Sequence, residues 1–329
     1  MALPSSGSVR LGADVNVELG NASTARISLG GASVRTLYGI ATGPIRLAAD
    51  GYGKSSGITY TFNTSTMNAS INITTVPGYV AGAANVNINV AAGVYLWSNS
   101  VTIPGLTITG GVTGDKVTLI NKGRIMGMGG NGGGAASYDS AGSNGGSAIR
   151  LGFNTTINNT DSSAYIGGGG GGGSSAAYDN IIGTACGGGG AGGGLGCDDG
   201  HGGAGGTIGG VGSNGSYYGA VEITGGAGGR IFPGSGGTAV SGTNQGGNGG
   251  GTGGSGGSIN NITSGAGGSA TAAGGSGYFT DSGGGGGGWG AVGGSSNYDG
   301  GNGGNAVELN GYTVTWTSGN TSRVYGAVA

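Results

Sequence analysis

The sequence predicts an all-β, partly irregular fold, and three observations carry that prediction. Short runs of alternating β-branched residues occupy the stretch from 51 to 126. Glycine makes up 93 of the 329 residues, against an average near 7%. A β pattern resumes after the glycines. We therefore expect an N-terminal docking unit (1–50), a β-rich domain that is a short-strand solenoid or sandwich (51–126), packed polyglycine II helices with variable loops (127–305) and a closing β-hairpin (306–329).

The N-terminal unit contains an internal duplication. Val9–Gly20 parallels Ile27–Gly39 with one inserted residue, and Ile45–Asp50 begins like a third copy. Each of the first two copies has an apolar pair of β type, then apolar residues at helical spacing, then the glycine that is preferred just past a helix end. Helices this short are marginal alone. Their apolar faces therefore need a cover, which is either the core of the same domain or a larger assembly.

The β-rich domain shows alternating strand patterns separated by turn residues. Asparagines alternate with Val86, Ile88 and Val90, which leaves these three for the core. Strands this short, at roughly ten-residue spacing, are typical of a sandwich or a solenoid. The phrase VTLINKGRIMGMGGNGG, in which a strand runs directly into glycines, favours coils stacked along an axis. The expected strands are Ile58–Phe62, Ala69–Val76, Asn85–Trp97, Ser100–Gly110 and Lys116–Gly127.

The glycine-rich part is predicted to be ordered. Collagen is excluded, because the glycines lack a period of three and proline is rare. Runs such as Gly167–Gly173 and Gly283–Gly288 alternate with inserts of other residues, whereas a flexible linker mixes Gly and Ser evenly. Glycine in the polyproline II conformation has no internal hydrogen bonds, so neighbouring tracts must pair through their backbones. The β-rich domain is the expected template for that packing, and Trp289 is interpreted as a lid on it rather than a ligand platform.

The last segment predicts a hairpin. Val307 and Leu309 precede an Asn310-Gly311 turn, and Tyr312, Val314 and Trp316 follow it in alternation. Arg323–Ala329 reads as one more strand.

Composition excludes several classes of protein. A net charge of −2 with 7% charged residues offers no basic patch for nucleic acid. Membrane insertion is not expected either, because the sequence has no apolar run of about 18 residues. The N-terminal residues contain no apolar run of signal-peptide type, so we expect synthesis in a cytoplasm. Cys186 and Cys197 lie close in sequence, and both a disulfide and two free thiols remain open.

Catalytic chemistry is not expected. His201 is the only histidine, and the 13 acidic residues are scattered, whereas glycoside hydrolysis needs a placed pair of carboxylates. The phrase CDDGHGG, which contains Cys197, Asp198 and Asp199 beside His201, is interpreted as a solvated turn rather than a metal loop. We predict no catalytic residue, no metal site and no cofactor.

The glycine runs, the strand-into-glycine phrases, the MALPSSG opening and the TVTWTSGNTSRVYGAV ending together resemble the receptor-binding tip adhesins of T-even-like bacteriophages. That resemblance covers most of the chain. It implies a sandwich of polyglycine II helices whose variable loops recognise a receptor. The N-terminal unit and the β-rich domain depart from the pattern, so a self-contained fibre or a homotrimeric tip is compatible with the sequence.

The inserts have the composition of a binding surface, because tyrosine provides rigid contact area and small polar residues provide adaptable hydrogen bonds. A Tyr-Asp pair recurs in three of them, and a Tyr-Tyr pair stands in a fourth. A structural role is the alternative, with Tyr covering a lattice edge and Asp capping backbone N–H groups. The candidate receptor-binding residues are Tyr138, Asp139, Tyr178, Asp179, Tyr217, Tyr218, Tyr298 and Asp299.

The resulting hypothesis is a virion tail-fibre or tail-tip protein. Its predicted partners are other virion proteins, through the N-terminal unit, and a bacterial surface receptor, either an outer-membrane protein or a glycan. A purely structural virion protein, such as a capsid decoration or a fibre stalk, is the alternative. A glycine-rich cell-wall or matrix protein is a third reading, which the N-terminal residues disfavour.

Overall fold

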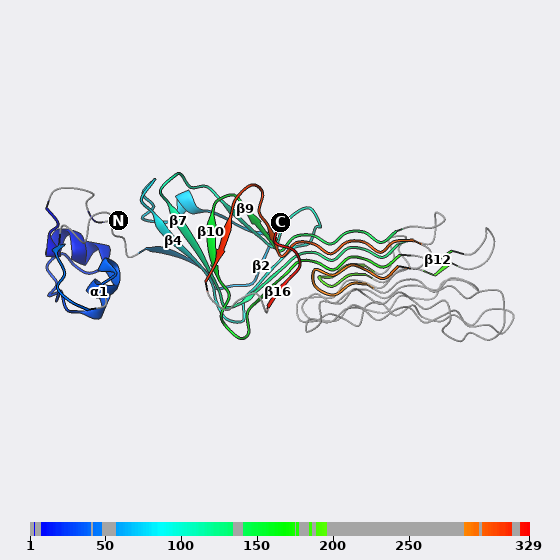
Figure 1. Ribbon diagram of the computed structural model, residues 1–329, viewed down its shortest axis with the longest axis horizontal. Helices are drawn as coiled ribbons and strands as arrows, with labels where there is room; N and C mark the ends of the chain where they lie inside the picture. Colours follow the sequence, from blue (N-terminus) through cyan, green and yellow to red (C-terminus); the bar gives the residue numbers. More distant parts are fainter. Residues whose placement is uncertain are drawn as a thin grey trace.

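The computed structural model describes residues 3, 8–40, 42–47, 57–133, 141–174, 176–177, 184–185, 189–195, 286–295, 298–317 and 323–329. Figure 1 shows three parts in a row: a small helical unit, a β body and a set of extended glycine tracts that leave the β body on the side away from the N-terminus. No helix in the described ranges is long and apolar enough to cross a membrane.

The N-terminal unit holds two short helices, as the duplication predicts. They are η1 (Leu11–Asn16), a helix of π type, and α1 (Ala32–Tyr38). Gly39 follows α1 in the left-handed conformation, with φ of +70°, which is the usual helix-ending glycine. The unit has its own apolar cluster around Val15, Val34 and Leu37. In the described residues this cluster shares no member with the core of the β body.

The β body consists of three parallel sheets. Sheet A has the order β1 (Ile58–Phe62), β4 (Asn85–Val90), β7 (Lys116–Asn121), β10 (Thr155–Asn158) and β15 (Val314–Trp316). Sheet B has the order β16 (Val324–Tyr325), β11 (Tyr165–Gly167), β8 (Arg124–Met126), β5 (Tyr95–Trp97) and β2 (Thr66–Met67). Sheet C has the order β14 (Val307–Glu308), β9 (Ile149–Leu151), β6 (Leu106–Thr109) and β3 (Ala69–Asn72).

The chain visits these sheets in the repeated order A, B, C, so each circuit adds one parallel strand to every sheet. This is a three-sided β-solenoid, one of the two architectures predicted. Some expected strands are divided at its corners. The run Asn85–Trp97 contains both β4 and β5, which belong to different sheets, with a turn at Gly93 (φ +76°) between them. After β3 the chain enters a short 3₁₀ helix, η2 (Ile73–Thr75), where the sequence predicted a longer strand.

The predicted C-terminal hairpin is wrong. The turn at Asn310-Gly311 exists, with positive φ at both residues, but its flanking strands do not pair with each other. β14 pairs in parallel with β9, and β15 pairs in parallel with β10. The turn is a corner between sheets C and A. Because each strand finds a ready edge on the preceding coil, the two strands stack on that coil. The last residues continue the solenoid, with Val328 bridged in parallel to Val307.

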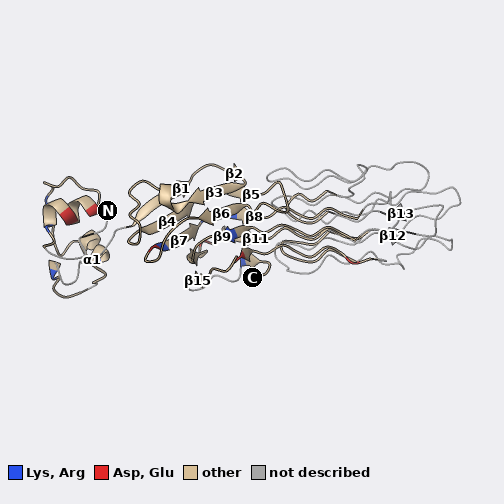
Figure 2. Ribbon diagram, turned by 90° about the horizontal axis from the view of Figure 1, so that it is seen from above, with Lys and Arg blue, Asp and Glu red and all other residues tan. Residues whose placement is uncertain are grey.

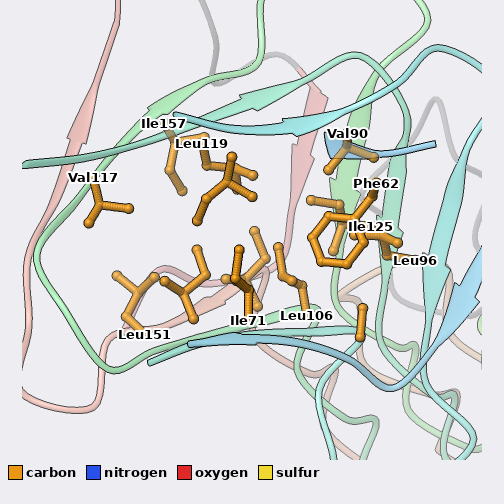
Figure 3. Close-up of a cluster of buried hydrophobic side chains, with 14 of the residues drawn as sticks. Phe62, Ile71, Val90, Leu96, Leu106, Val117, Leu119, Ile125, Leu151 and Ile157 are labelled. Carbon is orange, nitrogen blue, oxygen red and sulfur yellow. The ribbon is translucent and has the colours of Figure 1, made fainter. Parts of the chain in front are cut away.

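The solenoid core is filled by one inward-facing residue in every two. Figure 3 shows Leu119, Ile157, Ile71 and Leu106 converging from facing sheets. Alternation fixes this placement, because successive strand side chains point to opposite faces. At the corner between sheets A and B the core becomes polar. There the buried Asn121 donates through Nδ2 to Asn159 Oδ1 at 2.8 Å.

The glycine tracts are inserted at one corner of the solenoid. They leave where β8 and β11 end, at Met126 and Gly167, and return where β9 and β14 begin, at Ile149 and Val307. Strands β9, β10 and β11 thus lie within 127–305 in the sequence and within the solenoid in space. We refer to the described tracts 127–133, 141–148, 168–174, 189–195, 286–295 and 298–306 as the glycine bundle.

Candidate functional site

The glycine bundle is joined by backbone hydrogen bonds that repeat at every third residue. Gly127, Gly130 and Gly133 donate to the carbonyl oxygens of residues 167, 170 and 173 at 2.8–2.9 Å. In the antiparallel direction, Gly169 donates to Gly146 and Gly172 to Ser143. Tract 168–174 also bonds to the segments 189–191, 286–290, 291–294 and 301–304. This central tract therefore uses its donors and acceptors in several directions at once.

Only glycine fits at the centre of the bundle. A Cβ at Gly171 would overlap the Gly301 carbonyl oxygen, and one at Gly169 would overlap that of Met128. Both obstacles are backbone atoms, which cannot rotate away. The bundle also contains asparagines whose side chains bond to neighbouring tracts. Asn131 Oδ1 accepts from the Leu195 N–H at 3.1 Å, and Asn144 Oδ1 accepts from the Asn302 N–H at 2.8 Å. Sequence reasoning missed these two residues, although each is an asparagine placed next to glycines.

An aromatic cluster joins the bundle to the solenoid. Trp289 is 1% exposed and packs with Met126 and Tyr165. Its ring lies 3.1 Å from the position that a Cβ on Gly167 would take, so it covers the inner end of the central tract. The interpretation of Trp289 as a lid rather than a ligand platform is therefore confirmed.

Arg124 fixes the outer side of this cluster. Its guanidinium lies 5.3 Å from the centre of the Tyr95 ring and 5.5 Å from that of Tyr165. Burial raises the pKa of the Tyr165 hydroxyl well above its ordinary value, and this hydroxyl contacts the Met126 sulfur at 3.4 Å. The junction is thus closely packed, and Tyr165 is held in its neutral form.

The opposite ends of the tracts also lie together. Gly133 donates to Gly173, Ser174 donates to Gly294, and Gly142 donates to Asp299 at 3.1 Å. These bonds gather the described ends of five tracts at the side away from the solenoid, which we call the distal end. A short antiparallel pair, β12 (Ala176–Ala177) and β13 (Thr184–Ala185), follows the central tract there.

Two of the eight candidate residues fall within the described ranges, and both lie at the distal end. Tyr298 is 38% exposed. Asp299 is exposed too, and its backbone carbonyl accepts from Gly142. The remaining candidates, Tyr138, Asp139, Tyr178, Asp179, Tyr217 and Tyr218, lie outside the described residues, as do Cys186, Cys197 and His201.

Charged residues are sparse over the described part of the molecule, as the ribbon colours in Figure 2 show. Within it, no three potential metal ligands among His, Cys, Asp and Glu come together. The most buried carboxylate of the solenoid, Asp115, serves the fold. Its oxygens accept from the Ala84 and Val112 N–H groups and from the Tyr79 hydroxyl at 2.6 Å. These contacts outweigh the opposing effect of burial and keep the pKa of Asp115 below its ordinary value.

The molecule is elongated, with a small helical unit at one end and exposed residues on a hydrogen-bonded glycine bundle at the other. Comparison with known proteins gives the family. The model described as "Phage tail fibre adhesin Gp38" matches residues 57–232, which is more than half of the chain. The chain therefore belongs to the phage tail fibre adhesin Gp38 family.

Among solved structures, the crystal structure of the gp37-gp38 adhesin tip complex of the bacteriophage S16 long tail fiber is similar to this chain. The TM-score is 0.50 and the identity 20%, over 90% of this chain and 91% of that chain. At this identity the likeness supports a shared fold. No curated protein sequence matches the chain.

The family confirms the prediction of a virion tail-fibre protein that binds a host receptor, and it decides against the capsid and cell-wall alternatives. It is a family of adhesins, so the protein works by binding and not by catalysis.

Proposed function

We propose that the distal end of the glycine bundle is the receptor-binding surface, with Tyr298 and Asp299 among its contact residues. The observation that carries this proposal is the hydrogen-bonded meeting of tract ends at residues 133, 142, 174, 294 and 299. Segment 134–140, which contains Tyr138 and Asp139, connects two of those ends. Binding loops on a rigid scaffold are a common arrangement, and a preordered support lowers the entropic cost of binding.

We also propose that the bundle consists of polyglycine II helices. The three-residue period of the hydrogen bonds supports this, because polyproline II geometry has three residues per turn and leaves every backbone group free for a neighbour. In this arrangement the solenoid is one domain and the bundle is a second domain inserted into it.

The N-terminal unit is proposed to dock the adhesin onto another virion protein. The apolar pairs Val9/Leu11, Ile27/Leu29 and Ile45/Leu47 all pack on its cluster, and the three leucines remain partly exposed. Three leucines that remain partly exposed in one small unit are suited to a partner surface. The S16 structure is of a complex between gp37 and gp38, so a gp37-like fibre protein is the proposed partner. The choice between an outer-membrane protein and a glycan as receptor, and the homotrimeric state, stay predictions.

Competition for phage adsorption tests the receptor-binding surface. Purified protein should reduce adsorption of the phage to its host, and the double changes Tyr298→Ala/Asp299→Ala and Tyr138→Ala/Asp139→Ala should each weaken that competition at least tenfold. Tyr60→Ala is the matched control, because Tyr60 is also 38% exposed but lies on β1 of the solenoid. If both double variants compete as well as the wild type, the distal end is not the receptor-binding surface.

A further inference from the structure

Sheet A of the solenoid carries a groove that neither the receptor-binding end nor the docking unit uses. Its volume is about 260 Å³. It crosses the first residues of β7, β10 and β15 and the corner from which these strands start. The lining residues are Asn85, Asp115, Lys116, Val117, Thr118, Asn154, Thr155, Thr156, Thr313 and Thr315.

A row of threonines forms the floor of the groove. Thr118, Thr156 and Thr315 are in register on adjacent parallel strands, so their side chains repeat at the strand spacing of about 4.8 Å. They stand on the outward phase, since Val117, Leu119 and Ile157 on the opposite phase are buried. In the described part of the chain their hydroxyl groups have no hydrogen-bond partner. A periodic row of free hydroxyls faces outward as a result.

The end of the groove is held in place by hydrogen bonds. Asn154 Oδ1 accepts from both the N–H and the hydroxyl of Thr313, at 2.9 and 3.1 Å. The amide of Asn154 is therefore oriented, and its Nδ2 has no acceptor among the described residues. An oriented amide beside a row of hydroxyls provides fixed donors and acceptors for a polar ligand.

The solvent-exposed charge in the groove is that of Lys116, because the carboxylate of Asp115 is nearly buried. Asp115 is 9% exposed and already accepts three hydrogen bonds from the protein. Lys116, next to it, is exposed and forms no ion pair with a described residue. One exposed ammonium group is too little for a polyanion such as nucleic acid, whose binding needs several cations. It is enough to favour a single carboxylate or phosphate group.

We propose that this groove binds an acidic saccharide, with the Thr118, Thr156 and Thr315 hydroxyls and the Asn154 amide bonding to sugar hydroxyls and Lys116 pairing with the acidic group. More of the lining is polar than apolar, whereas the sites of drug-like ligands are mostly hydrophobic. The adhesin then has a second, lateral contact with the cell surface. This proposal does not depend on which residues bind the receptor at the distal end.

Titration calorimetry of the full chain with three probes tests it. The probes are a uronic-acid oligosaccharide, a phosphorylated core oligosaccharide from lipopolysaccharide, and a neutral dextran oligosaccharide. We expect binding of at least one acidic probe and at least tenfold weaker binding of dextran; whichever acidic probe binds identifies the acidic group. Thr118→Val/Thr156→Val and Lys116→Gln should each weaken that binding at least tenfold. Val keeps the shape and β-branching of Thr, so the sheet should remain folded, which a thermal melt checks.

Thr59→Val/Thr61→Val is the matched control. These two threonines face outward on β1, in the same sheet but outside the groove lining. Absence of binding by the wild type at millimolar concentrations of both acidic probes overturns the proposal and leaves the groove as a hydrated sheet surface. Equal loss of binding in the control and the groove variants overturns the location. Dextran that binds as tightly as the acidic probes, with Lys116→Gln silent, overturns the assignment of an acidic ligand.

Discussion

The solenoid and the glycine bundle pair their backbone hydrogen-bonding groups in opposite ways. In the solenoid, backbone groups pair within sheets and buried side chains such as Leu119 and Ile157 fill the interior. In the bundle, backbone groups of neighbouring tracts pair directly, and at positions such as Gly171 no side chain fits between them. The solenoid is therefore sensitive to the removal of atoms, whereas the bundle is sensitive to their addition.

The difference follows from the interactions by which each region offsets the conformational entropy that it loses on folding. Ordering a residue costs about 1–2 kcal/mol, and glycine loses the most conformational freedom. The solenoid recovers this cost largely by burying apolar surface. The bundle has little such surface, and a net hydrogen bond contributes only about 0.5–1.5 kcal/mol. It must form cooperatively on a template, and four of its six described tracts begin or end on solenoid strands.

The largest effect is expected for Gly171→Ala in the central tract. The new Cβ meets the backbone of Gly301, so the cost should exceed the roughly 1–3 kcal/mol of ordinary overpacking. Hydrogen exchange should show loss of amide protection in tract 168–174, with the solenoid retained. Gly30→Ala is the control, because its Cβ would lie 3.7 Å from the nearest atom, Ser28 Oγ. Unchanged protection in Gly171→Ala would show that the bundle tolerates added atoms.

Trp289→Ala tests the junction between the two regions. It removes a large buried side chain, a change that costs about 3–5 kcal/mol. We expect amide protection to fall first in residues 286–295, next to the junction. Trp289→Phe should cost less than half as much, because Nε1 has no hydrogen-bond partner among the described residues. Equal effects of Ala and Phe would contradict a role in packing.

Leu119→Ala tests the solenoid core. Leu119 is fully buried on β7, and such truncations cost about 2–5 kcal/mol. Chemical denaturation should show this loss, and the bundle should lose protection together with its template. Thr61→Ala, at an exposed position of β1, should change stability by about 0.5 kcal/mol or less. A bundle that stays protected after the solenoid unfolds would refute the template role.

The smallest expected effect is the dependence of folding stability on pH through Asp115. Because the pKa of Asp115 is lowered in the folded state, its contribution to stability is present above the unfolded pKa and is lost as pH falls through the folded pKa. Asp115→Asn should cost about 2 kcal/mol near neutral pH, and the gap to the wild type should narrow below pH 3.8, the ordinary value. Thermal melts across the acid range measure that gap. A gap that is constant down to the lowest pH would exclude the carboxylate as its cause.

At alkaline pH the contribution of Tyr79 to stability changes in the opposite direction: it is lost as the pH rises. The hydrogen bond to Asp115 raises the pKa of Tyr79 to about 12, so its contribution is full below the ordinary value of 10.0 and is lost as pH rises through 12. In Tyr79→Phe this alkaline loss should disappear, and melts between these two pH values provide the measurement.

Local patterns were sufficient for much of the architecture. Alternation in Asn85–Val90 predicts which residues are buried, since a strand has a period of two, and Gly39 marks the end of α1. The glycine runs predict tracts without side chains, because nothing else allows backbones to approach so closely. At the candidate site, the Tyr298-Asp299 pair was found by composition, and the structure places it at the distal end.

Other features depend on contacts between distant residues, which local patterns do not encode. The Asn310-Gly311 turn is a hairpin signal in the sequence, yet β14 and β15 extend two different sheets because the previous coil already presents both edges. The threonine row of sheet A joins residues 118, 156 and 315 only after three circuits of the solenoid are stacked in register. The sequence by itself determined strand phase, glycine content and loop chemistry, since these are properties of neighbours along the chain. Only the tertiary structure decided register, sheet membership and the side on which the described tract ends meet, since these are set by packing between distant segments.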